Sequence, residues 1–313
     1  MQQGRNIWSY VGRMVVYLLV ILMGLGCLLP LLNILAISFS SSAAVAGNQV
    51  NLIPVGFNLA PYQKLLEDTQ FWRSSLISAV RVILELALNM VLVVLMAYPL
   101  SKPKREFRAR GVYMKFMIFA MLFNGGMIPT YLLMKQLGLL NTIGSLVLPG
   151  AVPIFDVILV MNFFAGVPKS LEEAAVIDGA NPIQVLCRVY LPCSMAVLAT
   201  IALFSIVGSW NDFFSGLIYI TQVRNFPLMT YIQSLNIDIA DLVKSGANVN
   251  SIENAAELSN KNLNAAKIVV STVPLIAIYP FLQIFYHRYC CWCRKGINSA
   301  KRPIKIEYQS LLV

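Results

Sequence analysis

The chain has 313 residues, of which 58% are hydrophobic and only 12% charged, and its mean hydropathy is +0.70. A soluble domain is about 45–50% apolar and about 25% charged, so this composition excludes an ordinary soluble protein. The net charge of +10 does not indicate nucleic-acid binding, because the basic residues concentrate in two short stretches beside apolar segments.

Six apolar segments follow one another along the chain, each long enough to cross a bilayer, which takes roughly 20 residues. They cover residues 14–38, 76–100, 112–133, 143–164, 195–220 and 266–286. We therefore expect an all-α, polytopic membrane protein with six transmembrane helices. No small-residue cleavage site closely follows the first segment, so we expect it to be a retained span and not a removed signal peptide.

The distribution of lysine and arginine predicts the orientation. The segment 101–110, SKPKREFRAR, carries five positive charges after the second span, and the tail 287–313 is basic as well. Because cytoplasmic loops are enriched in lysine and arginine, both termini are expected in the cytoplasm. The cytoplasmic N-terminus is then residues 1–13. By alternation, the polar stretch between the fourth and fifth spans is cytoplasmic, and the loops at about 39–75 and 221–265 are outside.

Several spans contain polar or helix-breaking residues, which are costly in lipid and therefore face protein or water. Arg81 and Glu85 are four residues apart and are expected to form an ion pair on one helix face. Asn124, Gly125 and Gly126 are expected to bend the third span before Pro129. The fifth span contains the polar step Ser209–Asp212, for which two interpretations remain: a lining of the transport pathway or helix–helix packing.

The motifs of common enzymes are missing. The sequence has no phosphate-binding GxxxxGK[ST] loop, no HExxH and no GxSxG, and its one histidine is His287. Asp156 and Asp212 are the residue types of an intramembrane acid protease, but no protease motif surrounds either. Cys290, Cys291 and Cys293 are poorly spaced for structural zinc, and reduced thiols are the favoured interpretation. We expect no catalytic residue, no metal site and no cofactor on this chain, and energy must come from ions or from another subunit.

The polar stretch 169–192 reads as two short helices joined by a turn. Ser170 is expected to cap the first helix in a capping box with Glu173, and Glu172 and Glu173 lie at the positive end of the helix dipole. Ala174 and Ala175 allow another surface to approach the backbone. Asp178 and Gly179 end the helix, with Gly179 able to adopt a positive φ.

The second helix of this stretch is expected to begin at Asn181, as the cap, with Pro182 in its first turn. Ile183, Leu186 and Tyr190 are spaced to share one face, and Leu191-Pro192 closes the helix. Such a rigid helix–turn–helix between two spans suits docking to a soluble protein and passing motion into the membrane.

This stretch carries a family signature in Glu173-Ala174-Ala175, Asp178-Gly179-Ala180 and Val189-Tyr190-Leu191-Pro192. It resembles the coupling loop of permease subunits of bacterial ABC importers, which have the MetI-like fold. The resemblance implies that this coupling loop (residues 169–192) inserts into a cytoplasmic ATPase subunit. The residues to which that role carries over are Glu172, Glu173, Ala174, Ala175, Asp178, Gly179, Ala180, Val189, Leu191 and Pro192.

Three further stretches are similar to the carbohydrate-uptake branch of this family: FNGGMIPTYLLMKQLGLLNTIGSLVLPG, NFFAGVPKSLEEAAVIDGA and SWNDFFSGLIYI. The branch is the MalG-like second permease of oligosaccharide systems, including alginate and polygalacturonan importers. The likeness covers about residues 10–286, with the family core at about 75–280 in a permease domain of 14–286. It implies a multi-pass subunit of the bacterial cytoplasmic (inner) membrane that imports sugars by alternating access.

The resemblance also implies the partners. A paralogous permease would complete a heterodimer, two ABC ATPase subunits would bind and hydrolyse ATP-Mg, and an extracytoplasmic solute-binding protein would deliver the sugar. Candidate residues of the pathway are Asn124, Tyr131, Trp210, Asn211 and Asp212. Alternatives are an importer permease for another solute (peptide, polyamine, phosphate or amino acid), an ion-coupled secondary transporter, and a membrane sensor or scaffold.

The tail 287–313 departs from the family, whose members end soon after the sixth span with a Gly-Ile-x-x-Gly-Ala-x-Lys pattern. One codon choice for residues 285–298, read from its second base, encodes Phe-Ile-Thr-Gly-Ile-Val-Val-Gly-Ala-Val-Lys-Glu-stop, which matches that ending. We hypothesise that the tail after about Gln283 is a frameshifted reading. Resequencing the gene tests this: codons incompatible with the alternative frame would refute it.

Overall fold

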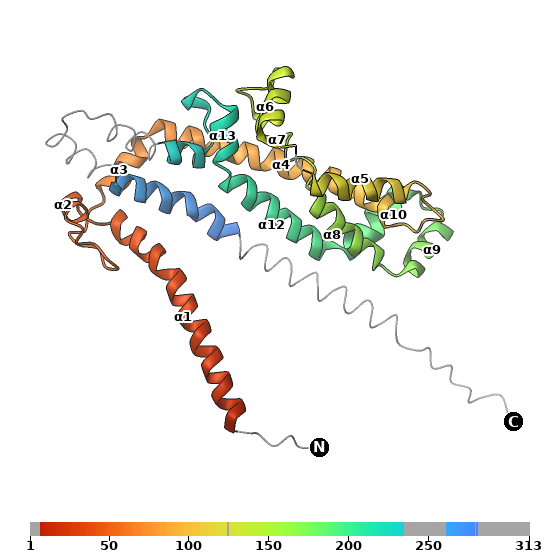
Figure 1. Cartoon of the computed structure of the whole chain (residues 1–313), viewed down its shortest axis with the longest axis horizontal. Coiled ribbons are helices and arrows are strands. Elements are labelled where there is room, and N and C mark those ends of the chain that lie inside the picture. The colour runs from red at the N-terminus through yellow and green to blue at the C-terminus, as the bar shows by residue number, and fades with distance from the viewer. Residues whose placement is uncertain (1–6, 124, 235–260, 279, 281–313) are drawn as a thin grey trace. The chain divides into compact units, whose positions relative to one another are not determined.

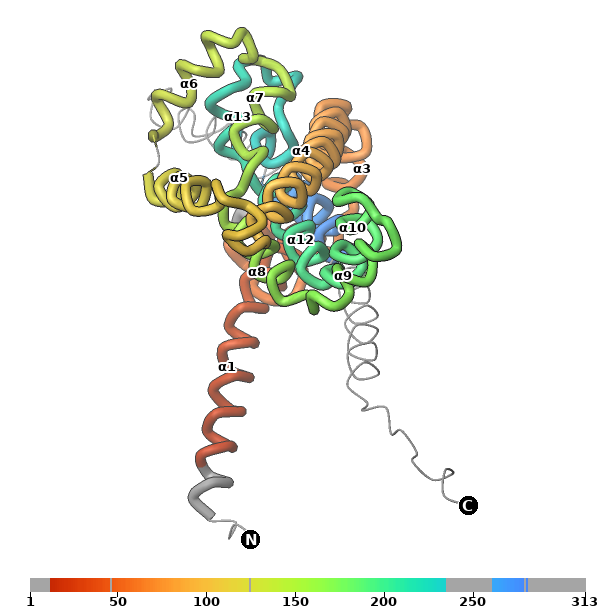
Figure 2. The backbone as a smooth tube through the Cα atoms, turned by 90° about the vertical axis from the view of Figure 1, so that its right-hand side faces the viewer, coloured from red at the N-terminus to blue at the C-terminus, as the bar shows by residue number. Residues whose placement is uncertain are grey.

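The computed structural model describes residues 7–123, 125–234, 261–278 and 280, and within these ranges the ordered elements are all helices. Figures 1 and 2 show the helices coloured from red to blue along the chain, which divides into two compact units. The first combines residues 1–73 with 231–274, and the second combines 74–230 with 275–313. The tail 287–313, with its cysteine cluster, and most of the loop 221–265 lie outside the described residues.

The first unit is built around one long helix. Its elements are α1 (Ile7–Ser38), α2 (Ser42–Ala46), α3 (Ala60–Glu67), the first turn of α4 (Thr69–Ser101), and helical segments over 231–234 and 261–274. The stretch Gly12–Ser38 is apolar, and its most hydropathic part is unburied, as expected for a helix that faces lipid or another membrane subunit, whereas Ala36 and Ser38 at its end are buried. At its end, Ser38 Oγ and Tyr62 Oη share a hydrogen bond of 2.9 Å.

A buried ion pair closes the first unit. Lys267 Nζ lies 2.6 Å from Asp68 Oδ2, and Tyr231 Oη donates to the same oxygen at 3.0 Å. Asp68 also caps α4, because its Oδ1 accepts the N–H of Phe71 at 3.0 Å. Burial raises the pKa of the Asp68 carboxyl, but its hydrogen bond and charge contact with Lys267 outweigh this, so its pKa lies below the ordinary 3.8.

Replacing Asp68 by Asn is expected to destabilise the first unit by about 3 kcal/mol, because Lys267 keeps a buried charge without its counterion. Since the folded pKa of Asp68 is depressed, its stabilisation is present above the unfolded pKa and is lost as the pH falls through the folded value. Thermal unfolding midpoints between pH 7 and pH 3 measure both effects. The matched control is Glu67→Gln, an exposed neighbouring carboxylate; an equal loss in both variants would contradict the role given to the ion pair.

The second unit contains most of the helices. They are α4 from residue 74 onward, α5 (Arg110–Leu122), α6 (Met127–Gln136), α7 (Ile143–Val147), α8 (Ile154–Ala165), α9 (Lys169–Ile177), α10 (Pro182–Val185), the π-helix η1 (Leu186–Tyr190), α11 (Leu191–Cys193), α12 (Met195–Asn211), α13 (Phe214–Tyr219), the 3₁₀-helix η2 (Val223–Asn225) and residues 228–230. In Figure 1, α9 and α10 lie at one end of this unit, and α6, α7 and α13 lie toward the other.

The core of the second unit joins α4, α8 and α12 to the segment that follows α9. It includes Val93, Ala97 and Leu100 of α4, Val157, Val160 and Phe164 of α8, Val197 and Ile201 of α12, and Val185, Leu186 and Tyr190. Phe164 and Tyr190 meet edge to face with ring centroids 5.4 Å apart. The coupling loop is therefore packed against three helices and is not a free loop.

Two helical stretches, Gly12–Ser38 and Thr69–Ser101, are long and apolar enough to span a membrane on their own. Three bent helix pairs, each counted as one broken span, raise the number of candidates among the described residues to five. The predicted sixth segment, 266–286, is described only in part, over 266–278 and at 280.

Three predicted segments are broken helices. The third divides into α5 and α6, which meet at 109° beside Gly126, whose φ is +89°, so the expected bend is present. The fourth was predicted as one helix over 143–164, which is wrong: α7 ends at Val147 and α8 begins at Ile154, because Pro149 and Pro153 interrupt the hydrogen-bond ladder. The fifth stops at Asn211 and resumes as α13, so the predicted polar step is a break in the helix.

Candidate functional site

The first helix of the coupling loop begins two residues earlier than its sequence suggests, because a cap at Ser170 would make Leu171 the first helical residue. α9 starts at Lys169, after Pro168, which supplies no side-chain cap. The predicted capping box of Ser170 and Glu173 is therefore wrong, since Ser170 already lies inside the helix.

The turn between the two helices depends on Gly179. Its φ is +82°, in the left-handed region predicted from the sequence. Residues with a Cβ rarely adopt this conformation, whereas glycine does so readily. Three N–H groups close the helix end by donating back into α9: Asp178 to the carbonyl of Ala174, Gly179 to that of Val176, and Ala180 to that of Ala175, each at 3.0 Å. A Cβ at Gly179 would meet nothing within 4 Å, so the requirement for glycine is one of backbone conformation and not of space.

The second helix begins where the sequence predicts. The Asn181 side chain accepts the N–H of Gln184 at 2.8 Å, and the Gln184 side chain accepts the N–H of Asn181 at 2.9 Å. This reciprocal capping box holds Pro182 in the first turn.

The buried face of the second helix differs from the prediction. Leu186 and Tyr190 are both buried, but Ile183 is 71% exposed, so the three residues do not share one face, and Val185 lies in the core instead. The residues after Val185 form a π-helix, which has more residues per turn than an α-helix and so ends the 3.6-residue spacing on which the prediction relied.

An apolar surface with charged neighbours lies at the tip of the coupling loop. Ile177, directly before the turn, is 85% exposed. Leu171, Val176 and Ile183 of the same loop are exposed as well, and several exposed apolar side chains in one loop indicate an interaction surface. We call the exposed residues around the turn the docking surface: Leu171, Glu173, Ala174, Val176, Ile177, Asp178, Gly179 and Ile183.

Other predicted coupling residues face inward. Ala175, Ala180, Val189 and Leu191 are half-buried and pack against the core of the second unit. Pro192 is also half-buried. These residues seat the loop on the helices beneath it, while the docking surface is left accessible.

Glu172 is turned toward its own subunit. Its carboxylate forms an ion pair with Lys102, which follows α4, and accepts a hydrogen bond of 2.6 Å from Tyr190 Oη. Lys102 Nζ also donates to Tyr190 Oη at 3.0 Å and lies 4.7 Å from the ring centroid of Tyr98. Burial raises the pKa of Glu172, but its bonds to Lys102 and Tyr190 lower it more, so its pKa is depressed and the carboxylate stays charged.

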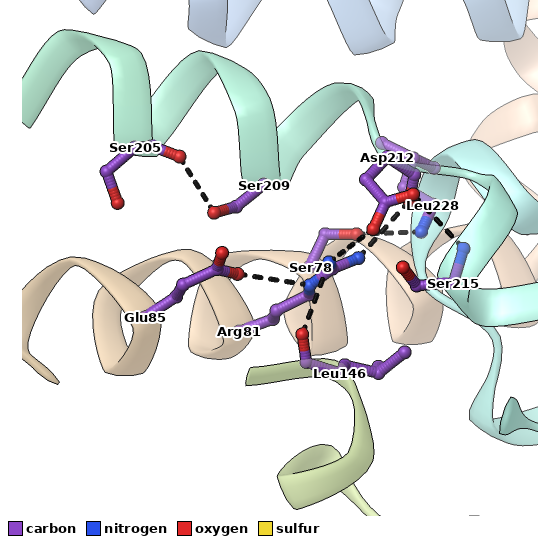
Figure 3. Close-up of polar contacts among 9 residues, drawn as sticks. All are labelled: Ser78, Arg81, Glu85, Leu146, Ser205, Ser209, Asp212, Ser215 and Leu228. Carbon is purple, nitrogen blue, oxygen red and sulfur yellow. Dashed lines mark hydrogen bonds and ion pairs between the residues drawn. The ribbon is translucent and has the colours of Figure 1, made fainter. Parts of the chain in front are cut away.

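A second polar network lies inside the apolar part of the second unit (Figure 3). Arg81 on α4 is 2% exposed, and its Nη2 donates to Asp212 Oδ2 at 2.6 Å. Arg81 Nη1 donates to the carbonyl of Asp212 at 3.2 Å, and Nη2 also reaches the carbonyl of Leu146 at 3.4 Å. The predicted pair with Glu85 is present, with Arg81 Nε 3.5 Å from Glu85 Oε2.

Asp212 has a structural role in this network. Its Oδ1 accepts the N–H of Ser215 at 3.1 Å and so holds the start of α13, while its Oδ2 binds Arg81. One charged side chain on α4 is thereby joined to the break between α12 and α13 and to α7. This observation favours the packing interpretation of the polar step over a free carboxylate in a pathway.

The predicted pathway residues that the structure describes differ in exposure. Trp210 is buried, whereas Asn211 is exposed and donates to the carbonyl of Val207 at 2.9 Å. Tyr131 is half-buried on α6, and Asn124 lies outside the described residues. The ion pair of Arg81 with Glu85 was predicted from their spacing, but the bond of Arg81 to Asp212 was not.

In the part of the chain that the structure describes, no three His, Cys, Asp or Glu side chains gather as metal ligands would. Asp156 is buried at the start of α8, whereas Asp212 is bound to Arg81 at the end of α12.

The sequence of this chain is similar to those of known transport proteins. The family model described as "Binding-protein-dependent transport system inner membrane component" matches residues 75–286. Protein LplC of Bacillus subtilis (strain 168) is 40% identical over 256 residues, which are 82% of this chain and 85% of LplC. The polygalacturonan/rhamnogalacturonan transport system permease protein YtcP of the same strain is 34% identical over 272 residues, 86% of this chain and 93% of YtcP.

A solved structure matches the fold. One chain in the crystal structure of a bacterial ABC transporter involved in the import of the acidic polysaccharide alginate aligns with a TM-score of 0.80 at 32% identity. The alignment covers 91% of this chain and all of that chain. The fold of this chain is therefore similar to that of one chain of a solved ABC transporter.

Proposed function

This chain belongs to the family of binding-protein-dependent transport system inner membrane components, and from that membership we propose that it is the sugar-carrying permease subunit of an ATP-driven importer. The observation that carries the proposal is the coupling loop. Its docking surface is exposed around a glycine turn, while its other face is packed on α4, α8 and α12. A partner that binds this surface can move the membrane helices.

The proposed topology has six membrane spans with both termini in the cytoplasm. The five positive charges of residues 101–110 and the coupling loop then share the cytoplasmic side. The ion pair of Lys102 with Glu172 supports this, because it holds the basic loop and the coupling loop together. The first unit's loop around α2 and α3 would lie outside the cell.

The proposed transport cycle is alternating access. Two ATPase subunits, binding ATP-Mg, would close beneath this chain and a paralogous permease, and their coupling loops would move with them. The cavity between the two permeases would then turn outward to receive sugar from an extracytoplasmic binding protein. This chain would hydrolyse no ATP itself, and it would work in the bacterial inner membrane.

The substrate class comes from the relatives. One named relative transports polygalacturonan and rhamnogalacturonan, and the matched structure comes from an importer of alginate. We propose an oligosaccharide as the solute, with Asn211 as the most accessible of the described pathway candidates, since an exposed amide can orient sugar hydroxyls. The other candidates are weaker proposals: Asn124, Tyr131, Trp210 and Asp212. Asp212 is among them because its carboxylate is already bound to Arg81.

Reconstitution tests this function. The complex of both permeases and the ATPase is placed in proteoliposomes with its binding protein, and uptake is measured for oligogalacturonates, alginate oligosaccharides, maltotriose and a tripeptide. We expect ATP-dependent uptake of one sugar class and no ATP hydrolysis by this chain alone. Uptake of the tripeptide alone would show that the solute is a peptide and not a sugar. ATP hydrolysis by the isolated chain would refute the assignment of hydrolysis to separate ATPase subunits.

A further inference from the structure

Glu172 belongs to the coupling loop in sequence, but its surroundings differ from those of its neighbour Glu173. Glu173 is exposed within the docking surface. The Glu172 side chain is 21% exposed and is bound on both oxygens by groups of this same chain, Lys102 and Tyr190. A carboxylate held in this way has little capacity left for a partner protein.

The three groups form a closed triangle. The carboxylate accepts from Lys102 and Tyr190, and Lys102 also donates to the Tyr190 hydroxyl. Tyr190 is buried in the core, and its ring meets Tyr98 of α4 edge to face with centroids 5.2 Å apart. Charge-assisted bonds in a partly buried site are stronger and more directional than apolar contacts.

The triangle connects elements that are distant along the chain. Lys102 and Glu172 are 70 residues apart, and Lys102 directly follows α4. Arg110 Nε donates to the carbonyl of Leu100 at 2.8 Å, which fixes the end of α4 from the α5 side as well. A displacement of α9 therefore acts on the end of α4 through a polar contact, in addition to the core packing.

α4 can carry that displacement to the other polar network. Arg81 and Lys102 are 21 residues apart in sequence, and one helix connects them. At 1.5 Å per residue this is about 30 Å along the helix axis. At the other end of this helical stretch, Arg81 is hydrogen-bonded to Asp212 at the α12–α13 break and to the carbonyl of Leu146 in α7.

We propose that Lys102, Glu172 and Tyr190 form the link that transmits movement of the coupling loop into α4, so that Glu172 is a positioning residue and not an ATPase contact. The inference rests on the proposed function, because it concerns how the docked loop acts on the membrane helices. It assigns new roles to Lys102 and to the Tyr190 hydroxyl.

Distance measurements between spin labels test the link without knowledge of the substrate. One label is placed on the native, exposed Cys187 of the coupling loop and the other on Leu95→Cys, at an exposed position of α4. The five other cysteines are replaced by serine: Cys27, Cys193, Cys290, Cys291 and Cys293. The complete complex in nanodiscs is measured by electron spin resonance, with and without Mg²⁺ and a non-hydrolysable ATP analogue.

The parent complex is expected to show one distance that nucleotide does not change, because the loop and α4 move together. Tyr190→Phe, Glu172→Gln and Lys102→Met are each expected to show a second, nucleotide-dependent distance while the ATPase still copurifies. Lys102→Met is matched by Lys104→Met, an exposed lysine of the same loop, which should behave like the parent. Exchange of the two charges, Lys102→Glu with Glu172→Lys, should restore the single distance, since the summed reach of the pair is unchanged.

Three results would overturn the link: a nucleotide-dependent distance in the parent, a single unchanged distance in all three variants, or loss of the ATPase from the Glu172→Gln complex. The last would make Glu172 a docking residue. Failure of the proposed function is separate, because it would appear as an ATPase that still copurifies after Ile177→Asp, a change in the docking surface that leaves the link intact.

Discussion

Gly179→Asp is expected to abolish ATP-driven uptake while leaving the chain folded in the membrane. The turn requires a φ of +82°, which costs a residue with a Cβ about 1–2 kcal/mol. The new carboxylate would also add a negative charge to the docking surface beside Asp178. Because a Cβ at this position meets nothing within 4 Å, the core of the second unit has no reason to change.

A matched variant separates the two causes. Asn and Asp both adopt the left-handed conformation at times, but Asn carries no charge, so Gly179→Asn should retain much of the uptake. The measurement is uptake by proteoliposomes together with the amount of ATPase that copurifies. Normal uptake by Gly179→Asp would contradict docking at this turn.

Arg81→Met is expected to lower the free energy of unfolding of the second unit by about 3–5 kcal/mol, because it leaves the carboxylates of Asp212 and Glu85 without their cation. The two carbonyl groups of Leu146 and Asp212 also lose their donor. Thermal unfolding of the purified complex, followed by its midpoint, measures the loss.

Two companions sharpen this result. Arg81→Lys keeps the charge but lacks the planar fork that reaches several acceptors, so an intermediate loss is expected. Arg81→Met combined with Glu85→Gln and Asp212→Asn removes the uncompensated charges and should recover part of the stability. A midpoint for Arg81→Met equal to that of the parent would show that the network does not stabilise the fold.

Local sequence predicted the coupling loop well. The positive φ of Gly179 and the cap at Asn181 depend on residues within four positions of one another, and both were expected. Ile183 was misassigned because a π-helix changed the spacing after Val185. Hydropathy alone also made the fourth span continuous, although Pro149 and Pro153 divide it.

Long-range polar contacts could not be predicted from the sequence. The basic partners of Glu172 and Asp212, Lys102 and Arg81, lie 70 and 131 residues away, and no spacing rule reaches across such distances. Glu172 was therefore grouped with the docking residues, whereas its geometry points inward. A weak signal existed for Lys102, because it is the first basic residue after α4 and lies in a loop that the charge distribution places on the same side as Glu172.

A photoreactive amino acid at position 177, the exposed tip of the coupling loop, tests three things in one measurement. These are the orientation of the chain in the membrane, docking of the ATPase, and the response of the docked loop to nucleotide. Irradiation of cells that express the whole importer should link this chain covalently to the ATPase subunit, with a yield that changes when vanadate traps the nucleotide. The same residue at position 53, an exposed isoleucine of the loop predicted to lie outside, should give no such product. Linkage from position 177 to the extracytoplasmic binding protein, or to no importer subunit, would contradict the proposal that an ATPase drives this chain at its coupling loop.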